Sequence, residues 1–223
     1  AAEAFTARVR GSLRQIAFMT VPTAAGYLAF GFLLVGAMYR TGRFTVGDNW
    51  LVYLVLAGYA TGLVATTWSR LLQNAYFALG DTRTPAKVAL VRLVVSAGCA
   101  LPLMFWLDTL TVPGAAGQDP LRAGAVGLAL GSGVGAWAEL FALTRRLRRR
   151  AEGFALPTGR GFGLLGLSLL AALPAAAAWW VLPPLHVILQ AVVVLAVYAG
   201  VYLSAAQLAG VSELRAWLGG RRR

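Results

Sequence analysis

The chain is poor in the residues that build catalytic centres and covalent cross-links. It holds one cysteine, Cys99, and one histidine, His186, among its 223 residues. A single cysteine excludes an internal disulfide and a zinc site made of cysteines. The sequence also has no paired carboxylates at helical spacing and no glycine-rich phosphate loop followed by lysine. It therefore predicts a protein that is not an enzyme and that uses no metal or cofactor.

Charge is also scarce, since charged residues make up 13% of the chain and hydrophobic residues 59%. Soluble domains carry roughly 25% charged residues. The mean hydropathy is +0.70, and apolar runs recur that approach the roughly 20 residues needed to cross a bilayer. Because every backbone polar group must be paired within the hydrocarbon, helices are the expected elements. The composition predicts an all-α polytopic membrane protein.

The hydropathy pattern predicts six membrane-crossing helices in one transmembrane domain that spans the whole chain. The expected helices cover residues 16–39, 50–68, 88–107, 123–143, 162–182 and 185–208, and a basic tail covers 209–223. Pro183-Pro184 predicts a tight hairpin between the last two helices, since proline suits a first turn but cannot continue a helix. Thr45 and Asp48 have the spacing of a capping box, which predicts a helix start. The chain begins with Ala-Ala-Glu and not with methionine, so we expect a fragment or a processed form of a longer protein.

Basic residues are distributed unevenly along this pattern. Twenty basic residues against eight acidic ones give a net charge of +12. If the N-terminus is cytoplasmic, every basic residue lies in an inside segment except Arg40, Arg43 and Arg122. Cytoplasmic loops of membrane proteins carry such an excess, so both termini are expected in the cytoplasm. The bias explains the charge without a nucleic-acid partner, and the tail "SELRAWLGGRRR" suits an anchor on anionic lipids.

Two charged residues fall inside predicted spans. Glu139 and Arg92 would each lie about 9 Å from the inner boundary, at 1.5 Å per residue, if their helices are antiparallel neighbours. We expect an intramembrane ion pair between them, because charges inside a membrane pair with one another or face protein. Snorkelling of Arg92 to the inner headgroups is one alternative, and a proton- or substrate-coupling role of Glu139 is another. At the outer mouth, Arg40 and Arg43 suit either a solvated loop or an anionic headgroup.

Glycines recur at four-residue spacing in two predicted helices, at Gly58 and Gly62 and at Gly127, Gly131 and Gly135. Small residues at this spacing let helix backbones approach closely. We therefore expect close packing of these helices, and a sliding surface in a moving transporter is the alternative.

The most polar stretch in the middle of the chain is "YFALGDTRTPAK", from Tyr76 to Lys87. Gly80 is suited to ending one helix, and Pro85 is suited to opening the next. The charge bias places this turn on the cytoplasmic side. The stretch therefore predicts the cytoplasmic connection between the second and third helices.

Read in full, "NAYFALGDTRTPAKVALVR" resembles the signature of the MurJ (MviN) family of lipid II flippases, in which an aromatic helix end precedes an Asp-x-x-Thr-Pro turn. Two further stretches match the family in the same order: "YRTGRFT" at Tyr39–Thr45 and the glycine-rich run with a basic end at Ala123–Arg150. The sequence departs from the family where Gln73-Asn74 replace an arginine and where the aromatic pair is reversed. The family-motif residues of this cytoplasmic corner are Tyr76, Phe77, Asp81, Arg83, Thr84 and Pro85.

The resemblance implies the fold and mechanism of a larger transporter. Family members have about fourteen helices, so the six here resemble their last six and would form one lobe or part of one, within the multidrug/oligosaccharidyl-lipid/polysaccharide exporter superfamily. The implied function is alternating-access flipping of lipid II, the undecaprenyl-pyrophosphate-linked peptidoglycan precursor, in the bacterial inner membrane. The implied partners are that precursor, anionic membrane lipids and the remaining N-terminal helices. The corner would couple its two helices during transport, and the hairpin Phe162–Leu208 would face the lipid tail.

Other interpretations of the same residues stay open. An exporter of another polyprenyl-linked oligosaccharide, or a drug antiporter of the same superfamily, would share the helices and differ in its cavity. A non-transporting membrane scaffold would instead dock partners through the basic inner loop, Arg145–Arg160.

Overall fold

The computed structural model describes residues 2–40, 42–112, 121–150, 154–181, 186–211 and 213–214. Within those residues the chain forms six α-helices and no β-strand, apart from one isolated bridge between Thr111 and Arg122. The helices are α1 Ala2–Tyr39, α2 Val46–Ala78, α3 Arg83–Leu107, α4 Gly124–Arg150, α5 Thr158–Val181 and α6 Val187–Leu208. Each is long and apolar enough to cross a membrane, which confirms the all-α, multi-pass fold class.

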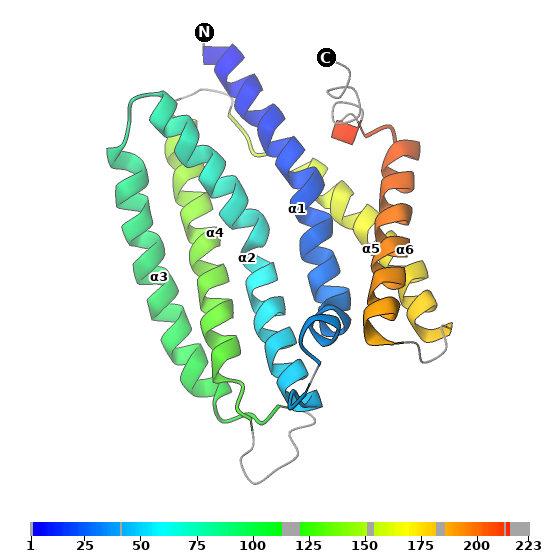
Figure 1. Cartoon of the computed structure of the whole chain (residues 1–223). Helices are drawn as coiled ribbons and strands as arrows, with labels where there is room; N and C mark the ends of the chain where they lie inside the picture. The colour runs from blue at the N-terminus through cyan, green and yellow to red at the C-terminus, as the bar shows by residue number, and fades with distance from the viewer. Residues whose placement is uncertain are drawn as a thin grey trace.

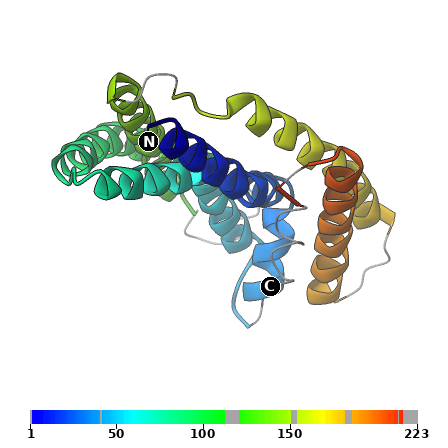
Figure 2. The ribbon, with the colours of Figure 1, turned by 90° about the horizontal axis from the view of Figure 1, so that it is seen from above.

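The order of the helices in space differs from their order in the chain. Figure 1 shows the sequence α3, α4, α2, α1 and then the pair of α5 and α6. α4 packs between α2 and α3, which barely touch each other, and α1 packs on α2 and also on α5 and α6. Seen from above, α1 to α4 form one group and the α5–α6 pair lies beyond α1 (Figure 2). The start of α1, the end of α6 and the α2–α3 turn lie at the same end of the molecule (Figure 1).

Glycines allow the close approach of the central helices. A Cβ atom on Gly131 of α4 would collide with the backbone of Ala100 on α3. A Cβ atom on Gly62 of α2 would lie 2.7 Å from the Cα atom of Gly133 on α4. Side chains cannot be accommodated at such distances, so these helices meet backbone to backbone. The close packing predicted from the glycine spacing is confirmed.

Two tyrosines of α6 complete the hydrogen bonding of α1. Pro22 has no N–H, so the carbonyl of Phe18, four residues earlier, loses its helical partner. The hydroxyl of Tyr202 donates to that carbonyl at 2.9 Å, and the hydroxyl of Tyr198 donates to the carbonyl of Pro22 at 2.8 Å. Both tyrosines are buried. α6 therefore docks on α1 through the turn that proline weakens.

The helices extend beyond the spans expected from hydropathy. α1 begins at Ala2 where residue 16 was expected, α2 runs over Val46–Ala78 where 50–68 was expected, and α4 continues to Arg150 where 143 was expected. Hydropathy marks only the part of a helix that crosses hydrocarbon, whereas the backbone ladder continues through polar turns on either side. The expected starts of α3 at 88 and of α5 at 162 are late for the same reason.

Cap residues predict the helix ends better than hydropathy does. Thr45 and Asp48 form the predicted capping box, in which the Thr45 hydroxyl accepts from the Asp48 amide and the Asp48 carboxylate accepts from the Thr45 amide. α2 accordingly begins at the next residue, Val46. The expected Pro183-Pro184 hairpin and most of the basic tail lie outside the described residues.

Candidate functional site at the α2–α3 corner

The corner that joins α2 to α3 is a tight turn held by backbone and side-chain hydrogen bonds. Gly80 follows the end of α2 with φ of +73°, a left-handed conformation that glycine adopts without steric cost. The amide of Gly80 donates to the carbonyl of Phe77 at 2.9 Å, and the amide of Asp81 donates to the carbonyl of Tyr76 at 3.0 Å. This pair of bonds satisfies the last carbonyls of α2. Gly80 thus ends the helix as the sequence predicts.

Asp81, two residues before α3, caps the first turn of that helix. Its Oδ1 accepts from the amide of Thr84 at 2.9 Å, and its Oδ2 accepts from the Thr84 hydroxyl at 2.7 Å. A carboxylate at this position satisfies an amide that the first turn of a helix leaves without a partner. Pro85 lies in the same first turn, where its missing N–H costs no hydrogen bond. Thr84 and Pro85 are buried, so the turn is anchored against the protein.

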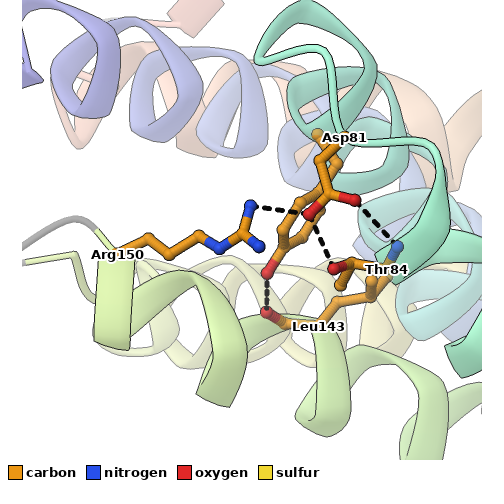
Figure 3. A network of polar contacts seen from close by, with 5 residues as sticks. Asp81, Thr84, Leu143 and Arg150 are labelled. Atoms are coloured by element: carbon orange, nitrogen blue, oxygen red, sulfur yellow. Dashed lines mark hydrogen bonds and ion pairs between the residues drawn. The ribbon is translucent and has the colours of Figure 1, made fainter.

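The corner is also tied to the end of α4, as Figure 3 shows. Arg150 places Nη1 2.6 Å from Oδ2 of Asp81, and its guanidinium lies 6.0 Å from the centre of the Tyr76 ring. The Tyr76 hydroxyl donates to the carbonyl of Leu143 on α4 at 3.0 Å. Tyr76 is fully buried. Three helices therefore meet at one aspartate and one tyrosine.

The hydrogen bonds fix the charge of Asp81. The hydroxyl and the amide of Thr84 lower the pKa of Asp81 to about 2, and the nearby guanidinium of Arg150 acts in the same direction. The carboxylate is therefore ionised at every pH that a living cell reaches. It serves as a permanent acceptor and is not poised to carry a proton.

A second polar cluster lies deeper, between α2, α3 and α4. Arg92 Nη1 lies 2.8 Å from Glu139 Oε2, and Gln73 Nε2 donates to Glu139 Oε1 at 2.7 Å. Glu139 is 1% exposed, while the side chain of Arg92 is 31% exposed. Each carboxylate oxygen therefore has one strong donor. Arg92 turns toward α4 and pairs with Glu139.

Sequence reasoning missed Gln73. It noted this residue only as a departure from the family signature, where an arginine is usual. Because Gln73 precedes Tyr76 by one helical turn on α2, the face that carries the buried tyrosine also carries the amide. That spacing was the available signal. The structure makes Gln73 the second partner of Glu139.

The side chains of the remaining expected site residues take no part in the hydrogen bonds and ion pairs of these two clusters. Phe77 is 49% exposed and points away from the buried face. Arg83 is exposed at the start of α3. Arg40 and Arg43 are exposed beside the α1–α2 connection, which lies at the opposite end of the molecule (Figure 1). The structure therefore separates the outer-mouth arginines from the corner.

Apolar grooves run along the sides of α5. A groove of about 720 Å³ lies between α5 and the central helices, and its walls include Trp68, Trp137, Phe141 and Phe162. A second groove of about 560 Å³ lies between α5 and α1 and includes Trp180. Neither groove presents a charged side chain. Their chemistry suits hydrocarbon chains.

Among the described residues, no group of three or more His, Cys, Asp or Glu side chains is placed to hold a metal ion.

Comparison with known proteins supplies the context for this geometry. The profile of the family described as "Lipid II flippase MurJ" matches residues 2–200. A probable lipid II flippase MurJ from Haemophilus influenzae is 24% identical over 177 residues, which cover 78% of this chain and 31% of the relative. One from Rickettsia prowazekii is 25% identical over 122 residues, covering 55% of this chain and 21% of the relative. One from Rhizobium meliloti is 33% identical over 86 residues, covering 39% and 16%.

A solved structure shares the fold. The inward closed conformation of a lipid II flippase MurJ superposes with a TM-score of 0.62 at 16% identity, over 92% of this chain and 40% of that one. The matched part of this chain thus spans between about a sixth and about a third of the curated relatives cited above.

Proposed function

Since the chain belongs to the MurJ family of lipid II flippases, we propose that it is part of a transporter that moves lipid II across the bacterial inner membrane. The observation that carries this proposal is the family match over residues 2–200, which includes all of α1 to α5 and the larger part of α6. The proposed substrate is the undecaprenyl-pyrophosphate-linked peptidoglycan precursor. The proposed mechanism is alternating access, with no covalent step.

In this proposal the chain is the C-terminal part of the transporter and forms one lobe or part of one, and further N-terminal helices complete the path. The close packing of α4 against α2 and α3 supports the movement of these helices as one body. Rigid bodies that rock against one another are the usual basis of alternating access. The headgroup then crosses between the lobes while its polyprenyl tail remains in lipid.

Charge bias supports an orientation with both termini in the cytoplasm. The α2–α3 corner and the basic end of α4 then face the cytoplasm. In that orientation an inside-negative potential assists the outward movement of an anionic headgroup, by about 2.3 kcal/mol per charge per 100 mV. Cysteines placed singly in the α1–α2 and α2–α3 connections of a variant lacking Cys99 test this topology by their reaction with an impermeant thiol reagent.

The corner has a mechanical role in this proposal. Asp81 holds the start of α3 through Thr84 and the end of α4 through Arg150. It links the helices so that they move together and does not contact the substrate. The apolar grooves beside α5, rather than charged residues, are the proposed seat of the lipid tail.

The experiment uses the full transporter that carries this chain, produced in a bacterial strain whose own flippase can be depleted. Outer-leaflet lipid II is measured after depletion. Rescue by the wild-type protein supports the function. Absence of rescue, with normal export of another polyprenyl-linked oligosaccharide, contradicts the substrate assignment.

Asp81→Ala separates the corner from the binding site. We expect slower flipping with nearly unchanged headgroup binding. The substitution removes the contacts that link α3 to α4, and Asp81 itself does not contact the headgroup in this proposal. Asp108→Ala is the matched control, since Asp108 also forms an aspartate–arginine contact, with Arg122 at 3.2 Å, but in an exposed connection at the other end. Equal loss of flipping and binding in Asp81→Ala would count against the mechanical role.

A further inference from the structure

A polar pocket of about 450 Å³ lies beside the corner, between the start of α3 and the end of α4. Four cationic side chains line it: Arg83, Lys87, Arg146 and Arg150. Among the described residues, Asp81 is the one acidic side chain in its lining, and its carboxylate is already engaged by Thr84 and Arg150. The pocket therefore keeps a strong excess of positive charge.

Three of the four cations that line this pocket have no acidic partner among the described residues. Arg83, Lys87 and Arg146 form no ion pair with another residue in the described ranges. All three are exposed. The amides that open α3 add the positive end of a helix dipole. Such a constellation favours an anion with several acceptor oxygens, of which a phosphate is the most common in a cell.

The outer face of α3 indicates what carries the phosphate. Arg83, Lys87, Leu90 and Val94 follow one another at spacings of three or four residues, so they lie along one face of the helix. Leu90 is 62% exposed and Val94 is 64% exposed. This face therefore carries cationic side chains beside the pocket and exposed apolar side chains toward the middle of the span. A ligand that matches both needs an anionic headgroup and a hydrocarbon chain, as an amphiphile has.

We propose that this pocket binds the phosphodiester headgroup of an anionic membrane phospholipid, whose acyl chains lie along the outer face of α3. Basic pockets between transmembrane helices bind such headgroups at the membrane surface. The cations of α3 and α4 then share one ligand, and the lipid braces the corner between these helices. In this proposal the lipid is distinct from the transported substrate and occupies a site between the start of α3 and the end of α4.

The test places p-benzoyl-phenylalanine at Leu90 in the purified full chain, reconstituted in vesicles of phosphatidylglycerol and phosphatidylcholine. Mass spectrometry of the photoadducts then reports which lipid occupies this face. We expect phosphatidylglycerol to be captured in preference to phosphatidylcholine. The variant Arg83→Gln/Lys87→Gln should lower that preference about 25-fold, from roughly one tenfold step per 1.4 kcal/mol and about 1 kcal/mol for each basic residue near the surface.

Two matched variants control for charge and folding. Arg40→Gln/Arg43→Gln removes two exposed arginines at the opposite end and should leave the preference unchanged. Arg83→Lys/Lys87→Arg keeps both charges and should retain it. Unchanged capture of phosphatidylglycerol in a folded Arg83→Gln/Lys87→Gln variant, checked by circular dichroism, would overturn the proposal.

Glycerol phosphate distinguishes the lipid from a free phosphate. It carries the headgroup chemistry without acyl chains, so we expect it to compete poorly with phosphatidylglycerol. Displacement of the lipid by glycerol phosphate at comparable concentration would assign the pocket to a soluble anion and refute the lipid site.

Discussion

The cluster of Gln73, Arg92 and Glu139 makes an asymmetric prediction about stability. Arg92→Met leaves the carboxylate of Glu139, which is 1% exposed, with Gln73 as its one partner. Removing one member of a buried ion pair costs about 3–5 kcal/mol because the other charge is left without compensation. We expect a loss near the lower end, about 3 kcal/mol, since Gln73 still donates one hydrogen bond.

Glu139→Leu should cost less than Arg92→Met. The side chain of Arg92 is already 31% exposed, so the guanidinium can turn toward the headgroups when its partner is gone. We expect the free energy of unfolding to fall by about 1–2 kcal/mol. The loss comes from the broken hydrogen bonds and from the unpaired charge of Arg92, which costs less than a fully buried charge because solvent or headgroups can reach it. The free energy of unfolding of the double variant Arg92→Met/Glu139→Leu should be close to that of Glu139→Leu. Apolar side chains of similar size can replace a buried ion pair at little net cost.

The assay is reversible unfolding of the reconstituted chain, followed by circular dichroism for the wild type, both single variants and the double variant. The exposed contact between Asp108 and Arg122 serves as the comparison, and its removal should change the free energy of unfolding by about 0–1 kcal/mol. Equal losses in the two single variants, or a double variant that loses the sum of both, would refute the assignment of a buried carboxylate that depends on Arg92.

Two further predictions concern the helix contact and the corner. Gly131→Ala should destabilise the chain by about 1–3 kcal/mol, because its methyl group would collide with α3; Gly98→Ala, where nothing lies within 4 Å, should be neutral or stabilising by up to about 1 kcal/mol. Thermal unfolding of both variants checks this pair. Asp81 has a pKa of about 2 against an ordinary value of 3.8, so its contribution to stability is present above the ordinary value and is lost as pH falls through about 2. The stability difference between wild type and Asp81→Asn should therefore be constant from about pH 5 to 8, and a change within that range would contradict the hydrogen-bonded turn.

Local signals in the sequence predicted the local structure well. Thr45 and Asp48 marked the start of α2, and Gly80 marked its end, because capping and left-handed turns depend on neighbouring residues alone. The six spans followed from hydropathy, but their ends did not, since polar helical turns outside the hydrocarbon leave no hydropathy signal. The first fourteen residues of α1, which precede the expected start at Ile16, are the largest example.

Contacts between distant helices were harder to predict. Counting residues along the two helices predicted that Arg92 and Glu139 lie at the same depth, and the structure places them in contact. That count gave no reason to include Gln73, which comes from a third helix. The position of α4 between α2 and α3 was likewise not predicted, although the glycines that permit it were noticed. Glycines at four-residue spacing show that one face of a helix is lined by small residues, but they do not show which helix will pack against that face.

The hydroxyl of Tyr202 on the carbonyl of Phe18 has a consequence for the order in which the chain is assembled. A carbonyl without a partner is costly inside a bilayer, and Pro22 creates one in the first of the six helices. The group that relieves it arrives with the last helix, after four others have been synthesised. During insertion α1 must therefore hold this carbonyl near water, near a lipid headgroup or against a membrane chaperone. The final placement of α1 is thus completed only when α6 enters the membrane.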